Sequence, residues 1–139
     1  MDNIKVLVVD DEHDFRETLV KRLQRRQFRI QGVENGPRAL EFVENQPVDV
    51  VILDVMMPGL DGLETLREIK KNKPLIEVIM LTGHASLESG LEGMKQGAFD
   101  YIMKPTSIDD LVIKINQAYE KKTAHEGKIR SPLKEDHTE

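Results

Sequence analysis

The sequence predicts a doubly wound α/β domain with a single parallel sheet, and three observations lead to this fold class. Five apolar runs of strand length alternate with five helical patterns within about 120 residues. Three of the runs are nearly continuous in apolar residues, which is typical of parallel strands covered on both faces. A helical pattern between each pair of successive runs indicates right-handed crossovers in a doubly wound sheet.

The apolar runs predict where the strands lie. They occupy residues 4–9, 28–33, 48–53, 76–81 and 99–103. The first, third and fourth are the nearly continuous runs. The second and fifth contain more polar residues, so we expect them at or near the edges of the sheet.

Apolar stripes at helical spacing fill the gaps between the strands. They are Phe15, Leu19 and Leu23; Leu40 and Val43, which follow Pro37; Leu63, Leu66 and Ile69; Leu87, Leu91 and Met94; and Ile108, Leu111, Val112, Ile115 and Tyr119. Gly90 and Gly93 weaken the fourth stripe, because each costs about 1 kcal/mol relative to alanine inside a helix. Ser107 and Asp110 resemble a capping box at the start of the fifth helix.

Composition limits the function classes. The chain has 139 residues, no cysteine and a formal net charge of −5, which argues against a disulfide framework, a thiolate metal site and direct nucleic-acid binding. The first residues do not show the basic segment followed by an apolar stretch that is typical of a signal sequence, and no apolar run approaches the roughly 18 residues that a membrane span needs, so we expect a cytoplasmic protein. We expect one domain over residues 1–122, followed by a polar tail over 123–139 that is disordered or extends the last helix.

Polar residues follow four of the predicted strands, where ligands bind in sheets of this kind. Asp10 and Asp11 follow the first strand, Asp54 the third, Thr82 the fourth and Lys104 the fifth. Three carboxylates with one lysine leave an excess of negative charge that a hard cation would neutralise, and Mg²⁺ suits oxygen ligands beside a phosphoryl group. Aspartate can accept a phosphoryl group covalently, and Asp54 on the central strand is the candidate.

The same residues resemble the receiver domain of two-component response regulators. The matching motifs are "VVDDE", "DVMMPGLDG" around Asp54, "LTG" with Thr82 and "YIMKP" with Lys104, in the family's order and spacing. The resemblance covers residues 4–120. It implies a flavodoxin-like sheet with strand order 2-1-3-4-5 and five helices.

The resemblance also implies a chemistry for the site. Asp54 would accept a phosphoryl group from a sensor histidine kinase or a phosphotransfer protein. Asp10, Asp11, Asp54 and the backbone carbonyl of Met56 would hold Mg²⁺. The protein would then be a signalling receiver and no enzyme beyond its own phosphoryl uptake and loss.

Further expectations concern the switch. Thr82 would bond the phosphoryl group, Lys104 would pair with it, and Tyr101 would move inward. The Lys104–Pro105 bond is expected to be cis. The output surface would be the face formed by the fourth helix, the fifth strand and the fifth helix, which would bind a downstream partner or a second copy of the chain after phosphorylation.

One position departs from the family pattern. Gly83 stands where family members usually carry alanine after the switch threonine, and glycine loosens that loop. Met56 and His84 occupy variable positions near the phosphoryl entrance and are candidates for setting the rate at which water removes the phosphoryl group. The loop after Asp54 would be shaped by Pro58, Gly59 and Gly62.

Three other functions compete with this interpretation. A phosphatase with an aspartate nucleophile needs a second aspartate two residues later, where Met56 stands. A calcium loop would use Asp10, Glu12 and Asp14 at alternate positions. It would, however, have Phe15 in place of the required glycine and Lys21 in place of the acid expected near the end of the loop. A degenerate receiver that docks without being phosphorylated is the remaining alternative. The sequence leaves open whether the receiver stands alone or begins a longer regulator.

Overall fold

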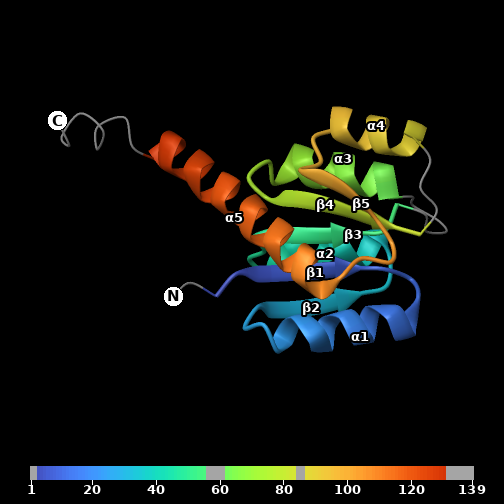
Figure 1. The fold of residues 1–139 in the computed structure, drawn as a ribbon. Coiled ribbons are helices and arrows are strands. Elements are labelled where there is room, and N and C mark those ends of the chain that lie inside the picture. Colours follow the sequence, from blue (N-terminus) through green and yellow to red (C-terminus); the bar gives the residue numbers. More distant parts are fainter. Residues whose placement is uncertain (1–2, 56–61, 84–86, 131–139) are drawn as a thin grey trace.

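The computed structural model describes residues 3–55, 62–83 and 87–130. Strands and helices alternate along the chain (Figure 1). The strands are β1 (Lys5–Val9), β2 (Arg29–Val33), β3 (Val50–Leu53), β4 (Glu77–Thr82) and β5 (Asp100–Met103). The helices are α1 (His13–Gln24), α2 (Gly36–Asn45), α3 (Gly62–Asn72), α4 (Leu87–Lys95) and α5 (Ile108–Arg130).

The strands form one parallel sheet in the order β2-β1-β3-β4-β5, as the sequence predicted. β1, β3 and β4 lie inside the sheet, and β2 and β5 lie at its edges. The register pairs Val9 with Leu53 and Leu53 with Met80, so the central strands end side by side. Residues that directly follow these strands therefore lie close together, at the carboxyl ends of the strands.

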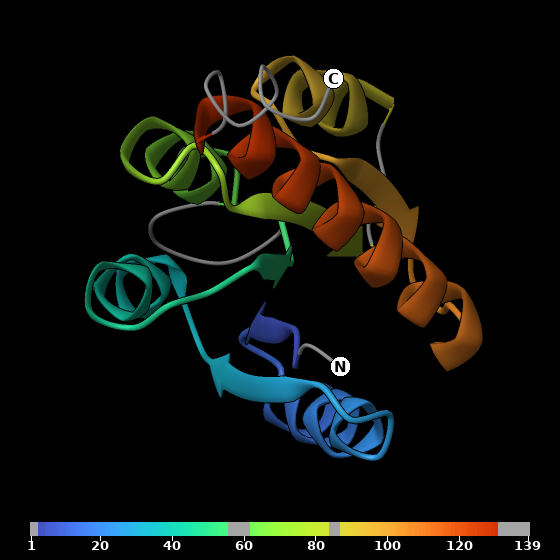
Figure 2. The same cartoon turned by 90° about the vertical axis from the view of Figure 1, so that its left-hand side faces the viewer.

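Helices cover both faces of the sheet, which explains why the inner strands are apolar throughout. Alternate residues of each strand point to opposite faces. Leu7, Val51 and Met80 belong to a core shared with α2 and α3, whereas Val8 and Ile52 belong to a core shared with α1 and α5. Figure 2 shows the two layers, with α2 and α3 on one side of the sheet and α1 and α5 on the other.

Helix starts follow the local sequence signals. The Asn35 side chain accepts a hydrogen bond from the backbone N–H of Arg38 at the start of α2, 2.9 Å away. Ser107 Oγ accepts one from the backbone N–H of Asp110 at 3.0 Å, which confirms the cap expected at α5. These caps fix where the helices begin relative to the strand ends.

The glycines that weakened the fourth helical stripe have a packing role. An added Cβ at Gly90 would lie 2.6 Å from Cε2 of Tyr101, and one at Gly93 would lie 2.0 Å from Cε of Met80. A helix without these side chains can approach the sheet where large residues project from it. The helix propensity lost in α4 is thus offset by close packing against β4 and β5.

Helix α5 continues past the sheet to Arg130, so the part of the polar tail up to that residue is helical (Figure 1). Residues 131–139 lie outside the described part of the chain. With 23 residues α5 has the length of a membrane-spanning helix, but it carries many charged side chains. Within the described ranges no helix combines the length and hydrophobicity that crossing a membrane requires.

Candidate functional site

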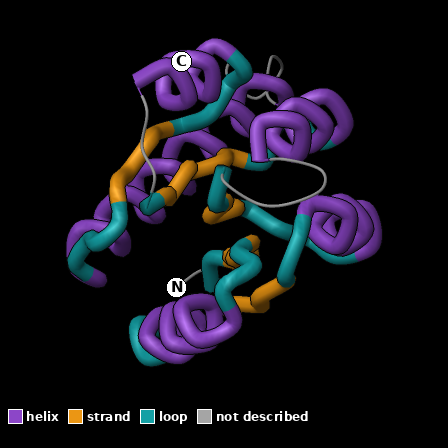
Figure 3. Tube along the Cα trace, turned by 90° about the vertical axis from the view of Figure 1, so that its right-hand side faces the viewer, coloured by secondary structure: helices purple, strands orange, loops and turns teal. Residues whose placement is uncertain are grey.

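The polar residues predicted to converge lie at the edge where the parallel strands end, the edge that Figure 3 views. Asp10 follows β1 directly, Asp54 follows β3, and Lys104 follows β5. Backbone hydrogen bonds continue the sheet into these positions, from Asp54 N–H to the carbonyl of Val9 at 3.0 Å and from Lys104 N–H to the carbonyl of Thr82 at 2.8 Å. The sheet therefore positions the site directly.

Three carboxylates form the acidic part of the site. One oxygen each from Asp10, Glu12 and Asp54 lies within 4.8 Å of the other two. Asp10 and Asp54 are buried, with 2% and 6% of their surface exposed, while Glu12 is exposed. Oxygens gathered in this way fit a hard divalent cation such as Mg²⁺.

Lys104 lies among these carboxylates. Its Nζ is 2.8 Å from Asp10 Oδ2, 3.1 Å from Glu12 Oε1 and 3.7 Å from Asp54 Oδ2. Burial lowers the pKa of the ammonium, but the hydrogen bonds to Asp10 and Glu12 and the nearby charge of Asp54 outweigh burial and raise that pKa above its ordinary value of 10.5. Lys104 is therefore a fixed positive charge at neutral pH.

The loop that carries Asp10 is held from two sides. Asp10 Oδ1 accepts a hydrogen bond from the backbone N–H of Glu12 at 2.9 Å, and the Asp10 carbonyl accepts one from Nη1 of Arg16 at 2.8 Å. The stem of Arg16 lies over Gly32 of β2, where an added Cβ would be 3.0 Å from Arg16 Cγ. These contacts orient the Asp10 carboxylate toward Asp54.

Asp54 is fixed by the close approach of α3. The backbone N–H of Gly62 donates to the carbonyl of Val55 at 3.2 Å. A Cβ at Gly62 would lie 2.2 Å from Cα of Val55 and 2.7 Å from the carbonyl oxygen of Asp54. Only glycine leaves room for this contact, which agrees with the shaping role expected of Gly62.

The proposed switch residues lie between the site and the outer helices. Thr82 is fully buried at the end of β4. Tyr101 on β5 is half-buried, and its ring packs beside Gly90 of α4 and against the core shared with α2 and α3. The Lys104–Pro105 peptide bond, next to Thr82, is cis.

Some of the residues singled out in the sequence cannot be placed. Met56, His84, Pro58 and Gly59 lie outside the described residues. Asp11 is described and exposed, and it does not belong to the group of three carboxylates.

Two residues of the described site were missed from the sequence. Glu12 was weighed only as part of a calcium loop, although its position two residues after Asp10 could have indicated a third carboxylate. Phe15 belongs to the apolar stripe of the first helix, and its ring centroid lies 4.0 Å from Lys104 Nζ. No local sequence signal indicates this contact.

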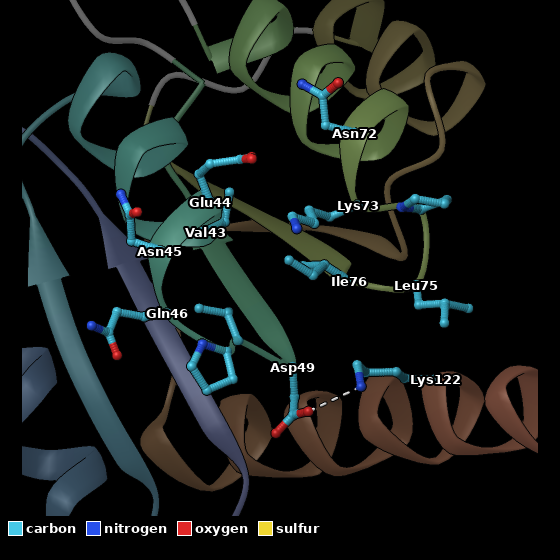
Figure 4. A pocket seen from close by; sticks show the side chains of 13 residues that line it. Val43, Glu44, Asn45, Gln46, Asp49, Asn72, Lys73, Leu75, Ile76 and Lys122 are labelled. Carbon is cyan, nitrogen blue, oxygen red and sulfur yellow. Dashed lines mark ion pairs between the residues drawn. The ribbon is translucent and has the colours of Figure 1, made fainter.

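A separate pocket lies at the other end of the strands, where β3 and β4 begin (Figure 4). It measures about 550 Å³ and lies between the ends of α2 and α3 and the side of α5. Its lining includes the ion pair between Asp49 and Lys122, whose charged atoms are 3.1 Å apart. None of the residues that form the acidic site lines this pocket, so it does not contribute to the chemistry at the carboxyl ends of the strands.

Comparison with known proteins identifies the family of the domain. The family model for the response regulator receiver domain matches residues 6–116. The receiver domain protein of Clostridium thermocellum shares 40% identity with a TM-score of 0.82, and covers 87% of this chain and 98% of its own. A CheY-like receiver domain from Methanospirillum hungatei gives a TM-score of 0.85 at 27% identity, over 89% of this chain and 99% of the other.

Longer regulators also match. An NtrX-like response regulator of Rickettsia bellii is 41% identical over 122 residues, which is 86% of this chain and 26% of that protein. The DNA-binding transcriptional regulator NtrC of Escherichia coli is 38% identical over 113 residues, 81% of this chain and 24% of its own length. The chain thus spans about a quarter of the curated relatives it matches. With the acidic site, the strand order and the family match together, the chain belongs to the response regulator receiver domain family of two-component signalling.

Proposed function

We propose that the chain is a working phosphoacceptor, in which Asp54 takes up a phosphoryl group in a reaction that depends on Mg²⁺. The observation that carries this proposal is the gathering of Asp10, Glu12 and Asp54 around the Lys104 ammonium. A receiver fold used only for docking would not need three carboxylates whose mutual repulsion destabilises the fold.

The covalent step is a phosphoryl transfer to Asp54. An Asp54 carboxylate oxygen forms a bond to phosphorus while the bond between phosphorus and the imidazole nitrogen of the donor breaks, and the nitrogen keeps the bonding electrons. Lys104, 3.7 Å from Asp54 Oδ2, would neutralise negative charge on the phosphoryl oxygens. Mg²⁺, when bound, would supply the remaining positive charge.

The cation ligands are part of the proposal. Asp10 and Asp54 are common to the geometry and to the family pattern; the geometry adds Glu12, and the family pattern adds Asp11 and the Met56 carbonyl. Calorimetric titration of Mg²⁺ into Asp11→Asn and Glu12→Gln variants separates the two additions. The carboxylate that binds the cation directly will show the larger loss of affinity.

Output is proposed to pass through Thr82 and Tyr101 to the surface formed by α4, β5 and α5. Tyr101 contacts α4 through Gly90, so a change at Thr82 that draws the ring inward would alter that contact. The partners we propose are a histidine kinase or phosphotransfer protein on the input side and an output domain or a second copy on the other, in the cytoplasm. Light scattering with and without a phosphoryl mimic tests whether phosphorylation causes dimerisation. If phosphorylation changed NMR amide shifts only on other surfaces, the proposed transmission through Thr82 and Tyr101 would be wrong.

The deciding experiment is intact mass spectrometry after incubation with acetyl phosphate. We expect one phosphoryl adduct that forms in the presence of Mg²⁺. It should form neither when EDTA replaces Mg²⁺ nor in the Asp54→Asn variant. Asp14→Asn, an exposed acid on α1 outside the site, is the matched control and should form the adduct normally. No adduct in the native chain would support the degenerate docking module instead.

A further inference from the structure

The Lys104 ammonium contacts an aromatic ring as well as the carboxylates. Its Nζ lies 4.0 Å from the centroid of the Phe15 ring. Phe15 is in the first turn of α1 and is partly buried against the core shared by α1 and α5. This packing restricts the position of its ring. Lys104 is thus placed between the negative face of a ring and three carboxylates.

This environment makes the ring contact significant. Only 12% of the Lys104 side chain is exposed. An ammonium over a ring face is attracted by the ring's quadrupole, and the attraction strengthens when water is excluded. In the part of the chain that the structure describes, the other such contact joins Lys121 to Phe99 at 5.8 Å, and 52% of the Lys121 side chain is exposed.

Lys104 occupies the oxygens that a divalent cation would need. It is within hydrogen-bonding distance of Asp10 and Glu12, two of the three carboxylates that fit Mg²⁺. An ammonium and a divalent cation repel each other and cannot share these oxygens at full strength. By linkage, whatever stabilises Lys104 in this position weakens cation binding, by up to the same factor.

We propose that Phe15 is a positioning residue that holds Lys104 among the carboxylates and thereby lowers the affinity of the site for Mg²⁺. The proposal rests on the Mg²⁺-binding function proposed above. A ring contact of this kind corresponds to an affinity change of about 2- to 30-fold. Phe15 would set the Mg²⁺ concentration at which the receiver becomes competent.

The test measures Mg²⁺ affinity by calorimetry in the full chain. We expect Phe15→Leu to bind Mg²⁺ about 2- to 30-fold more tightly than the native chain, because leucine keeps the apolar packing and loses the ring. Phe15→Tyr should restore native affinity. Phe99→Leu, which removes the other ring contact away from the site, should leave it unchanged.

A double-mutant cycle and a fluorination series separate positioning from general damage. In a Lys104→Met background, Phe15→Leu should no longer change Mg²⁺ affinity. Fluorinated phenylalanine at position 15 keeps the shape of the ring but weakens its negative face, so affinity should rise with the number of fluorines.

Three outcomes would overturn the proposal. These are weaker or unchanged Mg²⁺ binding in Phe15→Leu, an equal effect with and without Lys104, and a flat fluorination series. A native chain that binds no Mg²⁺ would overturn the proposed function together with this inference. A native chain that binds Mg²⁺ and accepts phosphate, with no effect at Phe15, would overturn the inference alone.

Discussion

Two glycines at the site differ sharply in what surrounds them. A Cβ at Gly62 would lie 2.2 Å from the backbone of Val55, whereas the nearest atom that a Cβ at Gly83 would meet among the described residues is Lys104 Cδ, at 3.7 Å. Gly83 also has no positive φ. Glycine is therefore required at position 62 by space, whereas at position 83 neither the described neighbours nor the backbone conformation require it.

The residue that departs from the family pattern can consequently be changed. We expect Gly83→Ala to raise the free energy of unfolding by about 0.4–1 kcal/mol, because alanine restricts the unfolded chain and fits the folded one. The added methyl group would touch the stem of Lys104 in ordinary contact. Thermal unfolding measures the effect, and a lowered Tm would show that the loop needs the freedom of glycine.

Gly62→Ala should have the opposite effect. The methyl group cannot be accommodated without moving α3 away from the end of β3, so we expect a loss of about 1–3 kcal/mol or more. Urea unfolding provides the measurement. Because the same shift would move Asp54, the variant should also take up phosphate from acetyl phosphate more slowly; unchanged stability would contradict the close approach.

At the scale of elements, the second half of α5 is attached to the starting edge of the sheet by charge. Lys122 Nζ lies 3.1 Å from Asp49 Oδ1 and 2.8 Å from Glu126 Oε2. Asp49 Oδ2 in turn accepts a hydrogen bond from the backbone N–H of Lys5 at 2.8 Å. Figure 4 shows the Asp49–Lys122 pair at the edge of the pocket. These pairs fix the direction in which α5 leaves the domain.

Removing Lys122 should loosen this attachment. Burial lowers the pKa of Lys122, but its bonds to Glu126 and Asp49 outweigh burial and raise the pKa above 10.5. The raised pKa in the folded state means that the stabilisation is complete at lower pH and is lost as the pH rises through that pKa. We expect Lys122→Met to cost roughly 2 kcal/mol at pH 7, and the difference from the native chain to shrink above about pH 10.5.

The measurement is urea unfolding at several pH values, with hydrogen exchange of the α5 amides. Lys114→Met is the control, because Lys114 also forms an ion pair, with Asp100, but its side chain is 37% exposed. The control should lose less stability. The proposed role of the Lys122 ion pairs would be wrong if both variants lost the same unfolding free energy. It would also be wrong if the stability difference between Lys122→Met and the native chain grew at high pH.

Elements were more predictable from the sequence than contacts between them. The apolar runs located all five strands to within two residues at each end. The signal is continuous for β1, β3 and β4, because these inner strands are buried on both faces. The fit of Gly93 against Met80 and the contact of Phe15 with Lys104 join residues far apart in the chain. A single sequence contains no local signal for such pairs, so they emerge only when the sheet is assembled.

At the scale of the whole molecule, the two edges of the sheet have different charge balances. At the starting edge, Asp49 and Glu126 share Lys122. At the ending edge, three carboxylates surround Lys104 with oxygens within 4.8 Å of one another. Two carboxylates at that distance repel by roughly 3 kcal/mol at an effective dielectric of about 20, so this edge stores unfavourable energy when no further cation is bound.

Relieving that repulsion should stabilise the whole domain, at the expense of the proposed phosphorylation. We expect metal-free Asp54→Asn to unfold with a free energy about 1 kcal/mol above the native chain, which corresponds to a Tm increase of roughly 4 °C. Mg²⁺ should stabilise the native chain more than the variant, because it binds the native site more tightly. Adding Mg²⁺ should therefore reduce the Tm difference between the two proteins. Thermal unfolding in EDTA and in Mg²⁺ measures both effects, with Asp14→Asn as the exposed control expected to change little. A metal-free Asp54→Asn that is less stable than the native chain would mean that the ion pair with Lys104 outweighs the repulsion, and that the acidic edge stabilises the fold instead of straining it.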